Sequence, residues 1–192
     1  MTLKILNGLK KLHGLLVVVL IVPALFSSCY AQTAKTRGSN DSIQLKAQKL
    51  KELYFKATNS PGISDMYKHQ FFDAFPNTFN ALNRLYGDTG DTIAILSGEA
   101  LNHINYLFND IGGIVTDTIY YRKIISIAMG GHWDADAINY FQHELREYVL
   151  AKPELVAYLL KKMPDKQIQS FWYFYFDEPI PQKAIPEKLS VI

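Results

Sequence analysis

The chain of 192 residues contains a single cysteine, Cys29. One cysteine cannot form a disulfide within the chain, so the sequence excludes the small disulfide-stabilised domains common among secreted proteins. The fold must therefore be held by an apolar core. The 163 residues that follow Cys29 are enough to build one domain with such a core.

Long apolar runs and a surplus of positive charge are also missing. The most apolar run, Leu15 to Phe26, has 12 residues, whereas a membrane-spanning helix needs about 20. Lys4, Lys10 and Lys11 lie in the amino-terminal segment that is predicted below to be a cleaved signal peptide. When they are left out, the 20 basic side chains fall to 17, against 18 acidic ones. Nucleic-acid binding requires a basic surface, so we expect no nucleic-acid partner.

Catalytic motifs are absent as well. The sequence has neither the His-Glu-x-x-His spacing of zinc hydrolases nor the Gly-x-Ser-x-Gly turn of serine hydrolases. The neighbouring acids Asp177 and Glu178 precede Pro179, and we expect them to be solvated at a helix end. The sequence predicts a protein that is not an enzyme and that carries no cofactor.

The amino-terminal region has the pattern of an export signal, with lysines, an apolar core and small residues in that order. We predict a signal peptide over residues 1–28. Cleavage before Cys29 would expose it for acylation and give a membrane-anchored lipoprotein of the bacterial cell envelope, for example of the outer membrane. Phe26 departs from the usual pattern of such a site. Cleavage after Ala31 is the alternative, and it would give a periplasmic or secreted protein.

Three further regions follow the leader. Residues 29–41 contain few large apolar side chains and are predicted to be a flexible tether. Residues 42–178 are predicted to form an all-helical domain. Residues 179–192 contain three prolines and are predicted to be an irregular tail.

Apolar residues recur at helical spacing through the domain. The predicted helices cover 42–57, 64–75, 78–86, 98–111, 118–129, 133–150, 153–160 and 165–176. The six aromatic residues 171–176 are also compatible with a strand, but no second strand exists to pair with it, so we predict a helix. The fold class is all-α, a compact array of about eight short helices joined by Gly/Pro loops.

One group of residues could bind a metal ion. His132 lies beside Asp134 and Asp136, and a histidine with two carboxylates suits a divalent cation. The simpler interpretation is that the two acids cap the helix predicted after Gly131. Asp117 is likewise expected to cap the helix that begins at residue 118.

Aromatic side chains provide the other candidate site. Tyrosine can bury its ring while its hydroxyl stays hydrated, which suits binding surfaces. We predict a recognition surface that includes Trp133, Trp172, Tyr173 and Tyr175.

Three segments resemble a family of small all-helical proteins of Bacteroidetes that are exported or lipid-anchored. These segments are Phe71–Gly87, Trp133–Ala137 and Phe171–Pro179, within a resemblance that spans Ser64 to Pro181. The resemblance implies an exported, all-α protein, and it supplies no functional residues.

The sequence therefore predicts a non-enzymatic envelope protein that binds an unknown protein partner, in the manner of an immunity protein. It would be held at the membrane through acylated Cys29 if it is a lipoprotein. The alternatives are a metal-dependent hydrolase that uses His132, Asp134 and Asp136, and a structural component of the envelope.

Overall fold

The computed structural model describes residues 41–88, 94–135, 137–179 and 189. The chain divides into two compact units, residues 1–43 and 44–192, and the second unit contains almost everything described. The predicted signal peptide, the lipidation site Cys29 and the tether up to residue 40 lie outside the described residues. Asp41, the last residue of the predicted tether, is already helical.

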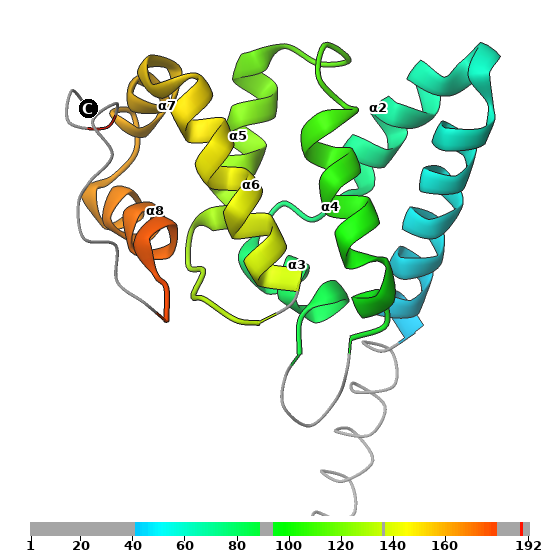
Figure 1. Cartoon of the computed structure of the whole chain (residues 1–192), viewed down its shortest axis with the longest axis horizontal. Helices are drawn as coiled ribbons and strands as arrows, with labels where there is room; N and C mark the ends of the chain where they lie inside the picture. Colours follow the sequence, from blue (N-terminus) through cyan, green and yellow to red (C-terminus); the bar gives the residue numbers. More distant parts are fainter. Residues whose placement is uncertain (1–40, 89–93, 136, 180–188, 190–192) are drawn as a thin grey trace, which may run out of the picture. The chain divides into compact units, whose positions relative to one another are not determined.

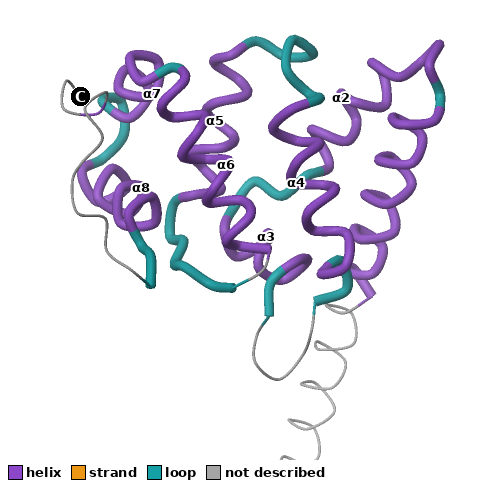
Figure 2. Tube along the Cα trace, in the orientation of Figure 1, coloured by secondary structure: helices purple, strands orange, loops and turns teal. Residues whose placement is uncertain are grey.

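The described part of the chain is all-α, as predicted (Figures 1 and 2). Residues 41–59 form a helix, and a short 3-10 turn, Pro61–Ile63, leads into α2, Ser64–Ala74. Helix α3 spans Phe79–Tyr86, and the Thr78 hydroxyl caps it by accepting a hydrogen bond from the Ala81 N–H at 3.3 Å. A second 3-10 turn, Ser97–Glu99, precedes α4, Ala100–Asn109.

The second half of the domain contains four further helices. Helix α5 spans Asp117–Ala128, α6 spans Ala137–Ala151, α7 spans Pro153–Leu160 and α8 spans Asp165–Phe176. Helix α6 packs against α4, α7 and α8, and α5 packs against α3, α7 and α8. Helix α8, which carries the aromatic run, therefore lies against both α5 and α6 (Figure 1).

Two predicted helix starts are wrong. Helix α6 begins at Ala137 rather than at Trp133, because residues 131–134 pack as a loop against α8. Asp117 does not cap α5: Thr116 takes the cap position, and Asp117 is the first helical residue, paired with Lys152. An acid in the first turn still stabilises the helix through the dipole.

Glycine ends α5 as the sequence predicted. Gly130 has a φ of +78°, a left-handed conformation that other residues adopt only with strain. At Gly131 a Cβ atom would lie 2.6 Å from the ring of Phe174. The two glycines let the chain turn out of α5 and pass close beside α8.

No helix within the described ranges is long and apolar enough to cross a membrane.

Candidate functional site: an aromatic groove between α7 and α8

The aromatic residues of α8 are divided between the core and the surface. Phe171, Phe174 and Tyr175 are buried, whereas Trp172 and Phe176 are half-buried. Tyr173 is 64% exposed. Successive residues of a helix are rotated by about 100°, so a run of six aromatics cannot all face the core.

The half-buried residues are packed in fixed positions. The Trp172 ring stacks on that of Phe176, with 5.8 Å between centroids. It also meets the edges of Tyr175 and Phe171, at 5.3 and 5.0 Å. Trp172 is therefore held by aromatic neighbours while part of its surface faces solvent.

A groove with a volume of about 620 Å³ separates α7 from α8. Its walls come from both helices and from one residue near the end of the chain. The lining residues are Ala157, Tyr158, Leu160 and Lys161 of the α7 side, Ile168, Trp172 and Phe176 of α8, and Leu189. A second hollow continues past Trp172 and Phe176 along Tyr173 to Asp177 and Glu178.

Two lysines lie at the α7 side of the groove: Lys161 lines it, and Lys162 contacts the lining residue Tyr158. Lys161 and Lys162 follow α7, and Lys166 stands in the first turn of α8 next to one acid, Asp165. The Lys162 ammonium lies 3.7 Å from the Tyr158 ring centroid and 2.5 Å from its hydroxyl oxygen. This hydrogen bond, aided by the lysine charge, lowers the pKa of the Tyr158 hydroxyl.

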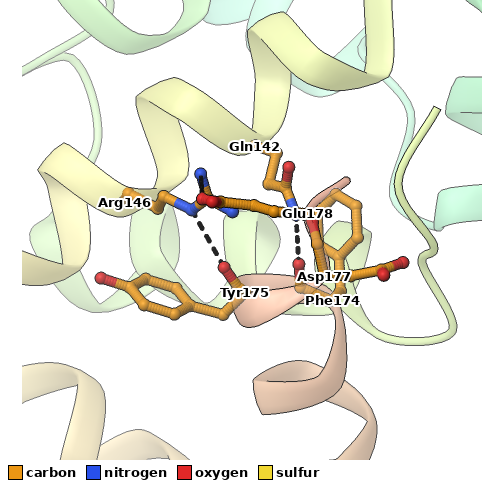
Figure 3. A network of polar contacts seen from close by, with 6 residues as sticks. All are labelled: Gln142, Arg146, Phe174, Tyr175, Asp177 and Glu178. Atoms are coloured by element: carbon orange, nitrogen blue, oxygen red, sulfur yellow. Dashed lines mark hydrogen bonds and ion pairs between the residues drawn. The ribbon is translucent and has the colours of Figure 1, made fainter. Parts of the chain in front are cut away.

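A polar network fastens the other end of α8 to α6 (Figure 3). The Gln142 side-chain amide donates to the carbonyl oxygens of Phe174 and Asp177, at 2.5 and 2.6 Å. Arg146 donates to the carbonyl of Tyr175 at 3.0 Å and forms an ion pair with Glu178. These carbonyls belong to the last turn of a helix and the residue after it, where the regular helical hydrogen bonds end. The Phe174 carbonyl also accepts from the backbone N–H of Asp177 at 3.3 Å.

Asp177 and Glu178 are therefore not the solvated acids that the sequence suggested. Both are half-buried. Asp177 accepts a hydrogen bond from the backbone N–H of Trp133 at 2.6 Å, and Glu178 pairs with Arg146. The sequence could not reveal either partner, because both lie more than 30 positions away.

Gln142→Ala is expected to lower the free energy of unfolding by about 2 kcal/mol, because it removes the two side-chain hydrogen bonds to the carbonyl oxygens of Phe174 and Asp177. The effect should include fraying at the end of α8, visible as a red shift in tryptophan emission. His143→Ala, at the neighbouring exposed position, is the control and should change stability by less than about 0.5 kcal/mol. Equal stabilities for the two variants would show that the network does not hold α8.

Two of the predicted metal ligands, His132 and Asp134, lie in the loop before α6. The His132 ring packs edge-on against Phe79, with 4.9 Å between centroids. One Asp134 carboxylate oxygen accepts a hydrogen bond from the next residue, Ala135, at 2.8 Å. Asp136 lies outside the described residues. Among the residues that are described, no three His, Cys, Asp or Glu side chains are grouped to hold a metal ion.

Of the four predicted recognition residues, the structure brings together two. Trp172 and Tyr173 lie side by side on the outer face of α8 and line the second hollow. Tyr175 is 1% exposed, so including it was wrong; burial raises the pKa of its hydroxyl to about 12. The Trp133 side chain lines neither hollow, because its loop is tied to Asp177 through the backbone.

Of the eight residues that line the groove, the predicted recognition surface included only Trp172. The other seven are Ala157, Tyr158, Leu160, Lys161, Ile168, Phe176 and Leu189. The rotation of residues around α8 could have indicated Ile168 and Phe176, since both lie on the same helical face as Trp172. No local pattern indicates Leu189.

Comparisons with protein-family models, with curated proteins and with solved structures find no match to this chain. The resemblance to exported Bacteroidetes proteins stays a prediction.

Proposed function

We propose that this protein is a protein-binding module of the bacterial cell envelope and that it binds its partner through the groove between α7 and α8. The observation that carries the proposal is the position of Trp172. It is half-buried, packed among aromatic rings, and lines both hollows on this face. Partly exposed tryptophan and tyrosine in well-packed surroundings are the residues that most often dominate the energy of protein–protein binding.

The groove suits an apolar segment of a protein with acidic residues at one end. Its walls are largely aliphatic and aromatic. Lys161 lines the groove and Lys162 contacts the lining residue Tyr158, so a carboxylate on the partner would meet complementary charge there. The polar network holds α8 in place before binding, so little ordering of this surface would oppose association.

The location at the envelope is supported by the leader pattern of residues 1–28 and by Cys29 in its acylation context. A small helical domain at that place, which binds another protein through one groove, would act as immunity proteins do. This comparison is by analogy with their mode of action.

The experiment places a photo-reactive amino acid at Tyr173 in cells of the source bacterium and identifies the cross-linked protein. The affinity of that protein for the purified chain is then measured. Trp172→Ala should weaken binding at least 30-fold, because truncation of a central aromatic costs about 2 kcal/mol or more. Phe55→Ala is the matched control, since Phe55 is 65% exposed on the helix of residues 41–59, and it should leave the affinity unchanged.

Equal affinities of the wild-type and Trp172→Ala chains would contradict the proposal. The two alternatives predict different results. A metal-dependent hydrolase would depend on His132 and tolerate Trp172→Ala. A structural envelope component would yield no stable soluble complex from the cross-linking experiment.

A further inference from the structure

Leu189 is the one described residue beyond Pro179, and its side chain lines the groove between α7 and α8. It is 7% exposed. A leucine in the irregular tail predicted from the sequence has no local reason to be buried. Leu189 forms part of the groove wall, so the groove already contacts one aliphatic side chain from a distant part of the sequence.

The chemistry around Leu189 defines what the groove accepts. Ala157, Leu160 and Ile168 contribute aliphatic surface, and Trp172 and Phe176 contribute aromatic surface. Burial of a leucine side chain in such surroundings is favourable by roughly 30-fold in an equilibrium constant. That contribution is large enough to hold one residue in place, and small enough for a competing segment to replace it.

We infer that Leu189 is an intramolecular occupant of the binding groove, and that a partner binds by inserting an aliphatic side chain in its place. The inference rests on the proposed function and specifies both its regulation and its ligand. The partner segment carries a leucine or isoleucine that replaces Leu189. An acidic residue beside it meets Lys161, which lines the same groove.

Competition with Leu189 lowers the apparent affinity of the partner for the wild-type chain. A partner that binds the wild-type chain must first displace Leu189, so its apparent affinity is reduced by the fraction of time that the groove is occupied. Removal of the Leu189 side chain removes this competition. Variants at Leu189 should therefore bind an aliphatic segment more tightly than the wild-type chain does.

The test uses the full mature chain in a Trp133→Phe background, so that Trp172 alone reports through its fluorescence. The probe is a synthetic peptide with the sequence of residues 184–192, which contains Leu189 and the acid Glu187. In the Leu189→Asp chain, Trp172 emission should shift to the red, and the peptide should reverse the shift. The peptide should bind this chain at least tenfold more tightly than it binds the wild-type chain.

Two controls accompany the measurement. A peptide in which leucine 189 is replaced by alanine should bind at least tenfold more weakly than the unmodified peptide. Leu189→Ala in the chain gives a milder opening of the groove, and it serves if the aspartate variant does not fold. Circular dichroism of each variant reports that the helices are intact.

Equal binding of the peptide to the wild-type and variant folded chains, or unchanged Trp172 emission in the variants, would overturn the inference. The cross-linking experiment is independent of this result. If the peptide binds the variant but no protein partner depends on Trp172, the proposed function fails while Leu189 remains the occupant. If partner binding depends on Trp172 but is equally tight in the wild-type chain and the Leu189 variants, the inference about Leu189 fails while the proposed function stands.

Discussion

Phe174→Ala is expected to lower the free energy of unfolding by about 4 kcal/mol, because truncation of a fully buried phenylalanine removes apolar contacts and leaves a cavity. Phe174 is 0% exposed, and its ring lies 5.6 Å from that of Phe79 and 6.3 Å from that of Phe141, between centroids. Gly131 approaches it so closely that a Cβ atom would overlap the ring. Urea unfolding followed by circular dichroism measures the loss.

The neighbouring residue provides a matched control. Tyr173 stands one position earlier in α8 and is 64% exposed, so Tyr173→Ala should change the free energy of unfolding by less than about 0.5 kcal/mol. The two variants remove rings of similar size from the same helix. Similar losses for both would mean that the division of α8 into a buried and an exposed aromatic face is wrong.

The stability of the wild-type chain is expected to fall by about 3 kcal/mol between pH 6.5 and pH 4 through His103 alone. This side chain is 1% exposed among the rings of Tyr54, Phe71 and Tyr86, and its Nδ1 lies 3.0 Å from the Tyr86 hydroxyl oxygen. Burial lowers the pKa of His103 to about 4. The charge of Glu99 opposes this shift, and that of Lys51 adds to it.

The direction of this pH effect follows from the protonation of His103 in the folded and the unfolded chain. An unfolded histidine takes up its proton near pH 6.5, whereas His103 in the folded chain takes it up only near pH 4. Between these values the unfolded state binds the extra proton, so each pH unit of acidification lowers the free energy of unfolding by about 1.4 kcal/mol. Above pH 6.5 the group is neutral in both states and has no effect.

Urea unfolding at half-unit steps from pH 7.5 to pH 4 checks this. His103→Gln removes the titrating group, and its stability should depend less steeply on pH than that of the wild-type chain. His143→Gln removes an exposed histidine and should keep the wild-type slope. Parallel curves for the wild-type and His103→Gln chains would contradict the prediction, whatever their absolute stabilities.

The helices of this domain could be predicted from the sequence because their signals are local. Apolar spacing, Thr78 at a helix start, Pro153 in a first turn and Gly130 at a helix end all act within a few residues. The aromatic run of α8 was also predictable as a helix, since the sequence offers no second strand candidate of similar quality to pair with it.

The candidate site could not be predicted in full, because contacts between segments distant in the sequence bring its residues together. Trp133 stays outside α6 because its N–H is held by Asp177 of a distant segment. Gln142 and Arg146 read as ordinary residues of an amphipathic helix, and only the packing of α8 gives them the carbonyl oxygens to which they donate. The position of Leu189 in the groove is a further long-range contact of this kind.

The fastening of α8 to α6 has a consequence for the order of folding. The donors on Gln142 and Arg146 are synthesised well before their acceptors at residues 174–178. Phe79 is synthesised earlier still, 95 residues before Phe174, whose ring it contacts. The core contacts that involve Phe174 can form only after α8 has been synthesised. A nascent chain that ends before α8 therefore lacks the aromatic contacts and the helix-end hydrogen bonds that join α8 to the rest of the domain.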